Sequence, residues 1–270
     1  MEYIYFIGLG CITGLMSGTL GIGGGVVIVP GLIYIYTHLG IADNLYMHVA
    51  SGTSLAVMIF TSTSNTISCQ RQKRIDWRLF RLMVPWIIVF DVVGAVMASF
   101  MRARWLETIF AGVILVMAAM MIFDLFKKNR SDAAEVSSKA KPISLLPRAV
   151  VGIVIGLKSG LLGIGGGAIA TPFFSTYGIP IRIATGTTAS LTLPIGIVGT
   201  MSFVLIGIIS GCNVNNTIGF VHWPSVIILA PFSMATAALG TKLANRMPTL
   251  WLKSLFIAFL LCTGVEQLIG

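Results

Sequence analysis

One glycine-rich segment occurs twice in this chain, and it constrains the fold more than any other feature. Residues 14–30 read GLMSGTLGIGGGVVIVP, and residues 156–172 read GLKSGLLGIGGGAIATP. Both copies lie inside long apolar stretches. Clustered glycines break a helix, because each costs about 1 kcal/mol relative to alanine in a helix interior and gives the backbone access to positive φ. Two copies therefore predict two related halves, each with a broken first helix.

The composition indicates a membrane protein rather than a protein with a water-soluble core. Of the 270 residues, 56% are hydrophobic and 10% are charged, and the mean hydropathy is +0.93. A helix needs about 20 apolar residues to cross the hydrocarbon layer. Long apolar stretches occur at residues 3–36, 46–67, 79–101, 106–126, 149–177, 184–210, 224–244 and 250–268. We expect an all-α polytopic membrane protein with two homologous halves of four elements each.

A charged segment rich in Ser and Ala separates the two sets of apolar stretches. It reads KKNRSDAAEVSSKAKPISLLPR and is typical of a flexible linker. The expected units are an N-terminal membrane repeat (1–126), a cytoplasmic linker (127–148) and a C-terminal membrane repeat (149–270). The similarity between the halves continues beyond the glycines, since residues 50–53 (ASGT) recur as 184–187 (ATGT). At one constant offset, Trp77, Pro85, Gly94, Trp105 and Leu106 recur as Trp223, Pro231, Gly240, Trp251 and Leu252.

The net charge of +9 does not indicate nucleic-acid binding. Most basic residues lie in short loops between apolar stretches, where they determine topology. The partner expected from this pattern is the lipid bilayer. The four cysteines form no Cys-x-x-Cys pair, and the three histidines show no metal-binding spacing. We expect neither a metal nor a cofactor, and no phosphate-binding loop for ATP is present.

Two arrangements of the halves are open, and the positive-inside rule separates them. If every element crosses the membrane once, the basic residues divide between the two sides. If each glycine-broken first element is re-entrant, the halves are inverted repeats, and only Arg102 and Arg104 of the loop residues fall outside. We favour inverted repeats with re-entrant or discontinuous first elements and both termini outside, an arrangement found among secondary transporters.

The glycine segments predict an anion site. Consecutive glycines at a helix break expose backbone N–H groups, and the positive end of a half-helix adds to them. Small hydroxyl side chains near the breaks would complete a polar wall. Close helix packing is the alternative explanation for such glycines. The expected substrate-binding residues are Ser17, Gly21, Gly23, Gly24, Gly25, Thr53, Lys158, Ser159, Gly163, Gly165, Gly166, Gly167 and Thr187.

Lys158 is the expected counter-charge for the anion. It follows Arg148 by ten residues, which is about 15 Å along a helix, and should lie near the middle of the membrane. Met16 occupies the corresponding position of the first half, so the site would be chemically asymmetric. The alternative is that Lys158 extends along the helix to the membrane surface.

Asp91 is a second ionisable residue expected deep in the membrane. It could carry a coupling proton, pair with Lys158, or remain neutral and hydrogen-bonded in the packing. Its counterpart in the second half is Ala237. Asn65 lies near the end of the second apolar stretch, and we expect it to cap a helix or to bond between helices.

The duplicated GxxSGxxGIGGG motif with its trailing proline resembles the TauE/SafE sulfite exporter family. Both glycine motifs, the segment Ala-Ser/Thr-Gly-Thr, the basic central loop and the total length are similar. The resemblance covers essentially the whole chain. It implies a permease of a prokaryotic inner membrane that moves small sulfur-containing anions such as sulfite or organosulfonates, usually outward.

The prediction is therefore a secondary transporter and not an enzyme. An anion channel is an alternative that would use the same binding residues without alternating access. A membrane-embedded enzyme acting on a lipid or a sulfur compound is a further alternative. That reading needs a nucleophile and a base within reach, and the apolar stretches contain no such pair at helical spacing. The exact anion, the coupling ion and the choice between monomer and homodimer stay open at this stage.

Overall fold

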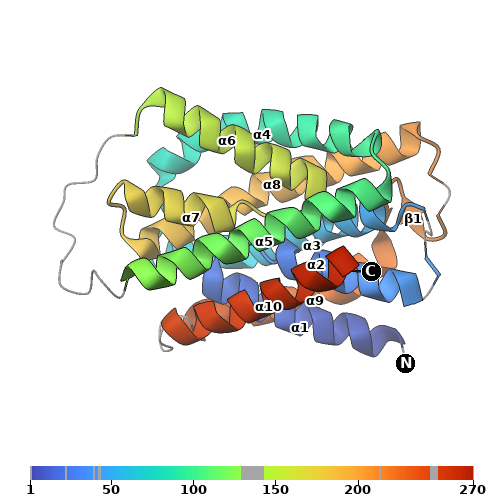
Figure 1. Ribbon diagram of the computed structural model, residues 1–270, viewed down its shortest axis with the longest axis horizontal. Coiled ribbons are helices and arrows are strands. Elements are labelled where there is room, and N and C mark those ends of the chain that lie inside the picture. The colour runs from blue at the N-terminus through green and yellow to red at the C-terminus, as the bar shows by residue number, and fades with distance from the viewer. Residues whose placement is uncertain are drawn as a thin grey trace.

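The computed structural model describes residues 2–21, 23–38, 40–41, 44–128, 143–212, 214–243 and 249–269, and this part is almost entirely helical (Figure 1). A two-stranded antiparallel ribbon pairs Thr217 with His222. The helices are α1 (Glu2–Leu20), α2 (Gly25–His38), α3 (Tyr46–Arg71), α4 (Trp77–Ser99), α5 (Ala103–Lys128), α6 (Leu145–Leu162), α7 (Gly167–Thr176), α8 (Ile181–Ile209), α9 (Trp223–Leu243) and α10 (Thr249–Ile269). The strands are β1 (Thr217–Ile218) and β2 (Val221–His222).

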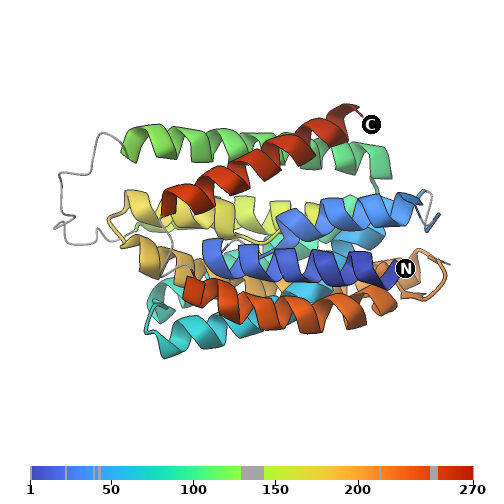
Figure 2. The ribbon, with the colours of Figure 1, turned by 90° about the horizontal axis from the view of Figure 1, so that it is seen from below.

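Each set of helices begins with a pair joined by a glycine-rich connection. α2 turns back along α1 toward the end of the molecule where the chain begins, and α7 turns back along α6 (Figures 1 and 2). Both connections contain backbone with φ between +67° and +89°, a region that side chains with a Cβ rarely adopt. These residues are Gly21, Gly23, Gly24 and Gly163.

Contacts between the helices follow the same plan in both halves. α1 packs against α9, and α6 packs against α4. α3 and α8 pack against each other, and α5 pairs with α10. Glycines permit the close approaches: a Cβ at Gly18 would collide with the Ala237 carbonyl, and a Cβ at Gly160 would collide with the Asp91 carbonyl.

Apolar side chains fill the interior and also cover much of the outside. α2 is buried along nearly its whole length, from Gly25 to Tyr36. Large apolar side chains are exposed on the helices, such as Val89 of α4 at 58% exposure and Leu205 of α8 at 57%. An apolar exterior of this extent is expected where lipid replaces water as the solvent.

Five helices in the described part are long and apolar enough to cross a bilayer: α4, the Ala103–Ile122 part of α5, α6, α8 and α9. The predicted all-α membrane class is confirmed at this level. α3 is equally long, but buried Ser, Thr and Asn side chains lower its hydropathy. Its polar groups face the protein interior, which is where a membrane protein tolerates them.

The ends of the expected linker differ from the structure. α5 extends to Lys128 and α6 begins at Leu145, so both ends of the segment 127–148 are helical. Pro147 does not prevent this, because proline is tolerated in the first turn of a helix. Most of the remaining linker lies outside the described residues. In Figure 1, α5 ends and α6 begins at the end of the molecule opposite to both chain termini.

Candidate functional site

The two glycine segments touch each other in the interior of the molecule. A Cβ at Gly25 would collide with the Gly163 carbonyl, and a Cβ at Gly23 would lie 3.3 Å from the Cα of Gly165. All described residues of 21–25 and of 163–167 are buried. The structure thus brings together the two groups of glycines that the sequence singles out, although Gly25 and Gly163 are 138 positions apart.

Free amide groups line both sides of this contact. The N–H groups of Gly23, Gly24 and Gly25 form no hydrogen bond within the described part of the chain. The same holds for the N–H groups of Gly165 and Gly166, and α7 begins directly afterwards. Two helix N-termini with their positive dipole ends therefore meet at the glycine contact, which favours an anion there.

Lys158 lies at the second glycine segment. Its side chain is only 6% exposed, and its Nζ donates a hydrogen bond of 2.9 Å to the Gly165 carbonyl. The ammonium group therefore points toward the interior contact and not along α6 toward an end of the helix. Its position suits the expected counter-charge.

Ser17 and Ser159 occupy corresponding places beside the two segments but bond differently. Ser159 Oγ donates to the Ile164 carbonyl at 2.6 Å. Ser17 Oγ instead accepts a hydrogen bond of 3.0 Å from Asn65 Nδ2. Asn65 thus makes a bond between helices, as the sequence analysis expects. The first segment is further contacted by Thr13, whose Cγ2 lies 2.8 Å from the position of a Cβ at Gly24.

Thr53 and Thr187 do not direct their hydroxyl groups at the glycine segments. Thr53 Oγ1 accepts from the backbone N–H of His222 at 3.0 Å, and Thr187 Oγ1 accepts from that of Asp76 at 2.9 Å. His222 and Asp76 directly precede α9 and α4, whose first turns lie at opposite ends of the molecule (Figure 1). Burial lowers the pKa of the His222 imidazole, whose Nδ1 lies 2.7 Å from Ser225 Oγ.

Asp91 is fully buried between α4, α6 and α8. Neither carboxylate oxygen has a hydrogen-bond partner within the described residues, and Lys158 bonds elsewhere. A Cβ at Gly199 would lie 3.0 Å from Asp91 Oδ2. An unpaired buried acid is costly, so an intramembrane acid of this kind marks a candidate functional residue.

Sequence reasoning missed Thr13 as a candidate residue. The side chain is fully buried, and its Oγ1 has no hydrogen-bond partner in the described part of the chain. It precedes Ser17 by four residues, so a helical reading of the first segment places both on one face. Asn65 Oδ1 is likewise buried without a partner. These unpaired oxygens make the first glycine segment chemically distinct from the second.

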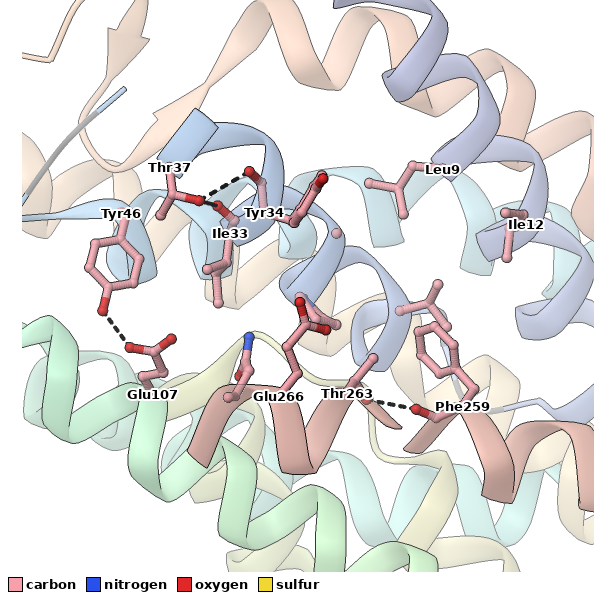
Figure 3. A pocket seen from close by; sticks show the side chains of 14 residues that line it. Leu9, Ile12, Ile33, Tyr34, Thr37, Tyr46, Glu107, Phe259, Thr263 and Glu266 are labelled. Atoms are coloured by element: carbon pink, nitrogen blue, oxygen red, sulfur yellow. Dashed lines mark hydrogen bonds between the residues drawn. The ribbon is translucent and has the colours of Figure 1, made fainter. Parts of the chain in front are cut away.

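A cavity of about 510 Å³ lies elsewhere, between α1, α2, α5 and α10. Figure 3 shows Tyr46 facing Glu107, to which its hydroxyl donates, and Glu266 extending from α10. None of the residues expected to bind the substrate lines this cavity. Its two carboxylates would repel an anion, so the glycine contact is the better candidate site.

Comparison with known proteins agrees with the membrane fold. The family model described as "Sulfite exporter TauE/SafE" matches residues 6–266. A "Probable membrane transporter protein" of Haemophilus influenzae is 29% identical over 259 residues, which cover 96% of this chain and 95% of that protein. A "Probable membrane transporter protein" of Methanocaldococcus jannaschii is 26% identical, over 97% of this chain and 93% of that protein. No solved structure matches.

Proposed function

Because the chain belongs to the sulfite exporter TauE/SafE family, we propose that it is a secondary transporter for small sulfur-containing anions such as sulfite or organosulfonates. The relatives named above are named probable membrane transporter proteins, and the apolar helices make this chain a multi-pass membrane protein. The proposal adds the substrate class, the direction, which is export, and the location in a prokaryotic inner membrane.

One observation carries the proposal: two helix N-termini meet at buried glycines whose N–H groups have no acceptor among the described residues. In the proposed site these amides would donate to the oxygens of a bound anion. Lys158 supplies the positive charge. Asp91 is the coupling residue in this scheme, and a proton is the coupling ion.

The proposed framework is a pair of inverted repeats with re-entrant first elements. The matched contacts of α1 with α9 and of α6 with α4 support it. Further support comes from the matched hydrogen bonds of Thr53 and Thr187, since His222 and Asp76 are separated by the same offset as Trp223 and Trp77. The end that contains the start of α6 would face the cytoplasm, as the distribution of Lys and Arg requires.

Flux into proteoliposomes tests the function. The purified chain should take up sulfite and methanesulfonate saturably, sulfate more weakly, and an imposed pH gradient should stimulate the flux. Counterflow stimulation would separate a carrier from an anion channel, which lacks alternating access. Absence of sulfite and methanesulfonate flux would overturn the proposal, and flux without a pH effect would remove only the coupling role of Asp91.

Lys158→Met tests the counter-charge, because methionine is the residue at the corresponding position of the first half. Loss of a charged hydrogen-bond donor from a buried site should raise the KM for sulfite about tenfold or more. Lys242→Met is the matched control, since Lys242 is exposed near the end of α9. An unchanged KM in Lys158→Met would exclude Lys158 from the site.

A further inference from the structure

We propose that the first half of the chain holds the anion, at a subsite formed by Thr13 and Ser17 together with the N-terminus of α2, with Asn65 as a positioning residue. The inference rests on the proposed function and deepens it. It assigns unequal tasks to two halves whose glycine segments are nearly identical in sequence.

The first half contains donors without acceptors. Thr13 and Ser17 lie one turn apart on α1 and both face Gly24: a Cβ there would lie 2.8 Å from Thr13 Cγ2 and 3.7 Å from Ser17 Oγ. Thr13 Oγ1 has no partner among the described residues. Because Asn65 Nδ2 donates to Ser17 Oγ, the hydroxyl hydrogen of Ser17 is left for another acceptor.

Free amides lie at the same place. The N–H groups of Gly24 and Gly25 have no acceptor in the described part of the chain, and α2 begins there. The hydroxyl groups of Thr13 and Ser17 and the amides of Gly24 and Gly25 are thus buried donors without an acceptor among the described residues, on side chains and backbone that touch at Gly24. Buried donors are normally satisfied, and a ligand that accepts several hydrogen bonds would satisfy this group.

In the second half the corresponding groups already bond within the protein. Ser159 donates to the Ile164 carbonyl, and Lys158 donates to the Gly165 carbonyl. The counterpart of Thr13 is Ile155, which has no donor. In this conformation the second half therefore offers fewer free side-chain donors, and its lysine contributes charge from the facing segment.

The two glycine segments also differ in the polar side chain that lies near each of them. In the register that aligns 50–53 with 184–187, Asn65 corresponds to Gly199. At the offset that aligns Trp77 with Trp223, Asp91 corresponds to Ala237. Asp91, although it belongs to the first half, lies against the helices of the second glycine segment: its carbonyl would collide with a Cβ at Gly160, and its Oδ2 lies 3.0 Å from the position of a Cβ at Gly199. The first glycine segment therefore has a neutral carboxamide nearby and the second has a carboxyl group, which disfavours an anion when it is ionised.

The ligand chemistry follows from the donors. A compact anion with two or three oxygen acceptors on one centre, such as sulfite or a short alkylsulfonate, can accept from Thr13, Ser17 and the α2 amides at once. A monatomic anion has a single acceptor atom, so it cannot offer separate acceptor atoms to donors that lie apart from one another. We therefore expect methanesulfonate to compete with sulfite, and chloride to compete poorly.

The test measures sulfite and methanesulfonate binding to the intact purified chain by titration calorimetry. Thr13→Val keeps the shape but removes the hydroxyl and should weaken both Kd values about five- to tenfold, whereas Thr13→Ser should restore affinity near that of the parent. Ser62→Ala is the matched control, because Ser62 is buried on α3 and donates to its own helix at Met58. It should bind within about twofold of the parent.

Asn65 is tested separately, because it acts through Ser17. Asn65→Ala should raise the KM for sulfite flux with the kcat within about twofold, as expected for lost positioning in the bound state. Asn65→Asp, which keeps the side-chain shape, should bind more weakly than Asn65→Ala because it adds a negative charge.

The outcomes separate the two proposals. If the parent chain binds sulfite but Thr13→Val and Asn65→Ala bind it equally well, only the subsite is overturned. Weaker binding by Ser159→Ala than by Ser17→Ala would likewise assign the ligand to the second half and overturn the subsite. If the parent binds neither sulfite nor methanesulfonate, the proposed substrate class fails, and the subsite fails with it.

Discussion

Single hydroxyl groups anchor the starts of two helices. Thr187 accepts from the N–H of Asp76 and thereby fixes the beginning of α4. Thr187→Val would leave the partly buried N–H of Asp76 without its acceptor. The change should lower the free energy of unfolding by about 1–3 kcal/mol. Thermal unfolding in detergent measures the loss. Thr185→Val is the control on the same helix, since the exposed Thr185 hydroxyl bonds only to the preceding turn; an equal loss in both variants would contradict the anchor.

At the residue scale, the sequence predicts which positions correspond but not where their side chains point. The repeat identifies Thr53 and Thr187 as corresponding residues, yet their hydroxyl groups bond to the backbone at the starts of α9 and α4. The Ser17–Asn65 bond joins residues 48 positions apart, and helical periodicity does not say which helices face each other. The constant rise of a helix predicts a depth for Lys158, and the structure shows that its side chain is buried.

Helices in this fold approach closely only where glycine removes the side chain. Gly18 on α1 contacts the Ala237 carbonyl of α9, so Gly18→Ala would force the two helices apart. We expect a destabilisation of about 1–3 kcal/mol. Gly8→Ala is the control on the same helix, because a Cβ there meets no atom within 4 Å. The control should be neutral or slightly stabilising in thermal unfolding, since alanine is the better helix former.

At the element scale, apolar length and composition suffice to predict the helical membrane class, because a span of about 20 residues is set by the thickness of the bilayer. The ends of α5 and α6 could not be predicted in this way. Lys128 and Leu145 lie beyond the apolar stretches, and helical backbone continues there although hydropathy changes. Hydropathy therefore locates spans but not helix termini.

The arrangement of the whole molecule makes a labelling experiment decisive. With the native cysteines replaced, Thr37→Cys and Asn215→Cys should react with a membrane-impermeant maleimide added outside intact cells. Both residues are exposed; Thr37 is in the last turn of α2 and Asn215 shortly precedes β1, and α2 ends and β1 lies at the end of the molecule that contains the chain termini (Figure 1). Arg71→Cys, at the opposite end, should react only after permeabilisation. Labelling of Asn215→Cys from the cytoplasmic side alone would contradict inverted repeats.

The contact between the two glycine segments has a mechanical consequence. Main-chain atoms of Gly25 and Gly163 meet there, and in the proposed transporter this contact would be the barrier between the two ends of the molecule. A side-chain gate opens by a change of rotamer on the nanosecond scale, but a backbone gate opens only when a whole hairpin moves. Leakage of water and small ions would then be limited by the slow step that also moves the substrate, so a tight seal needs no bulky residue at the centre.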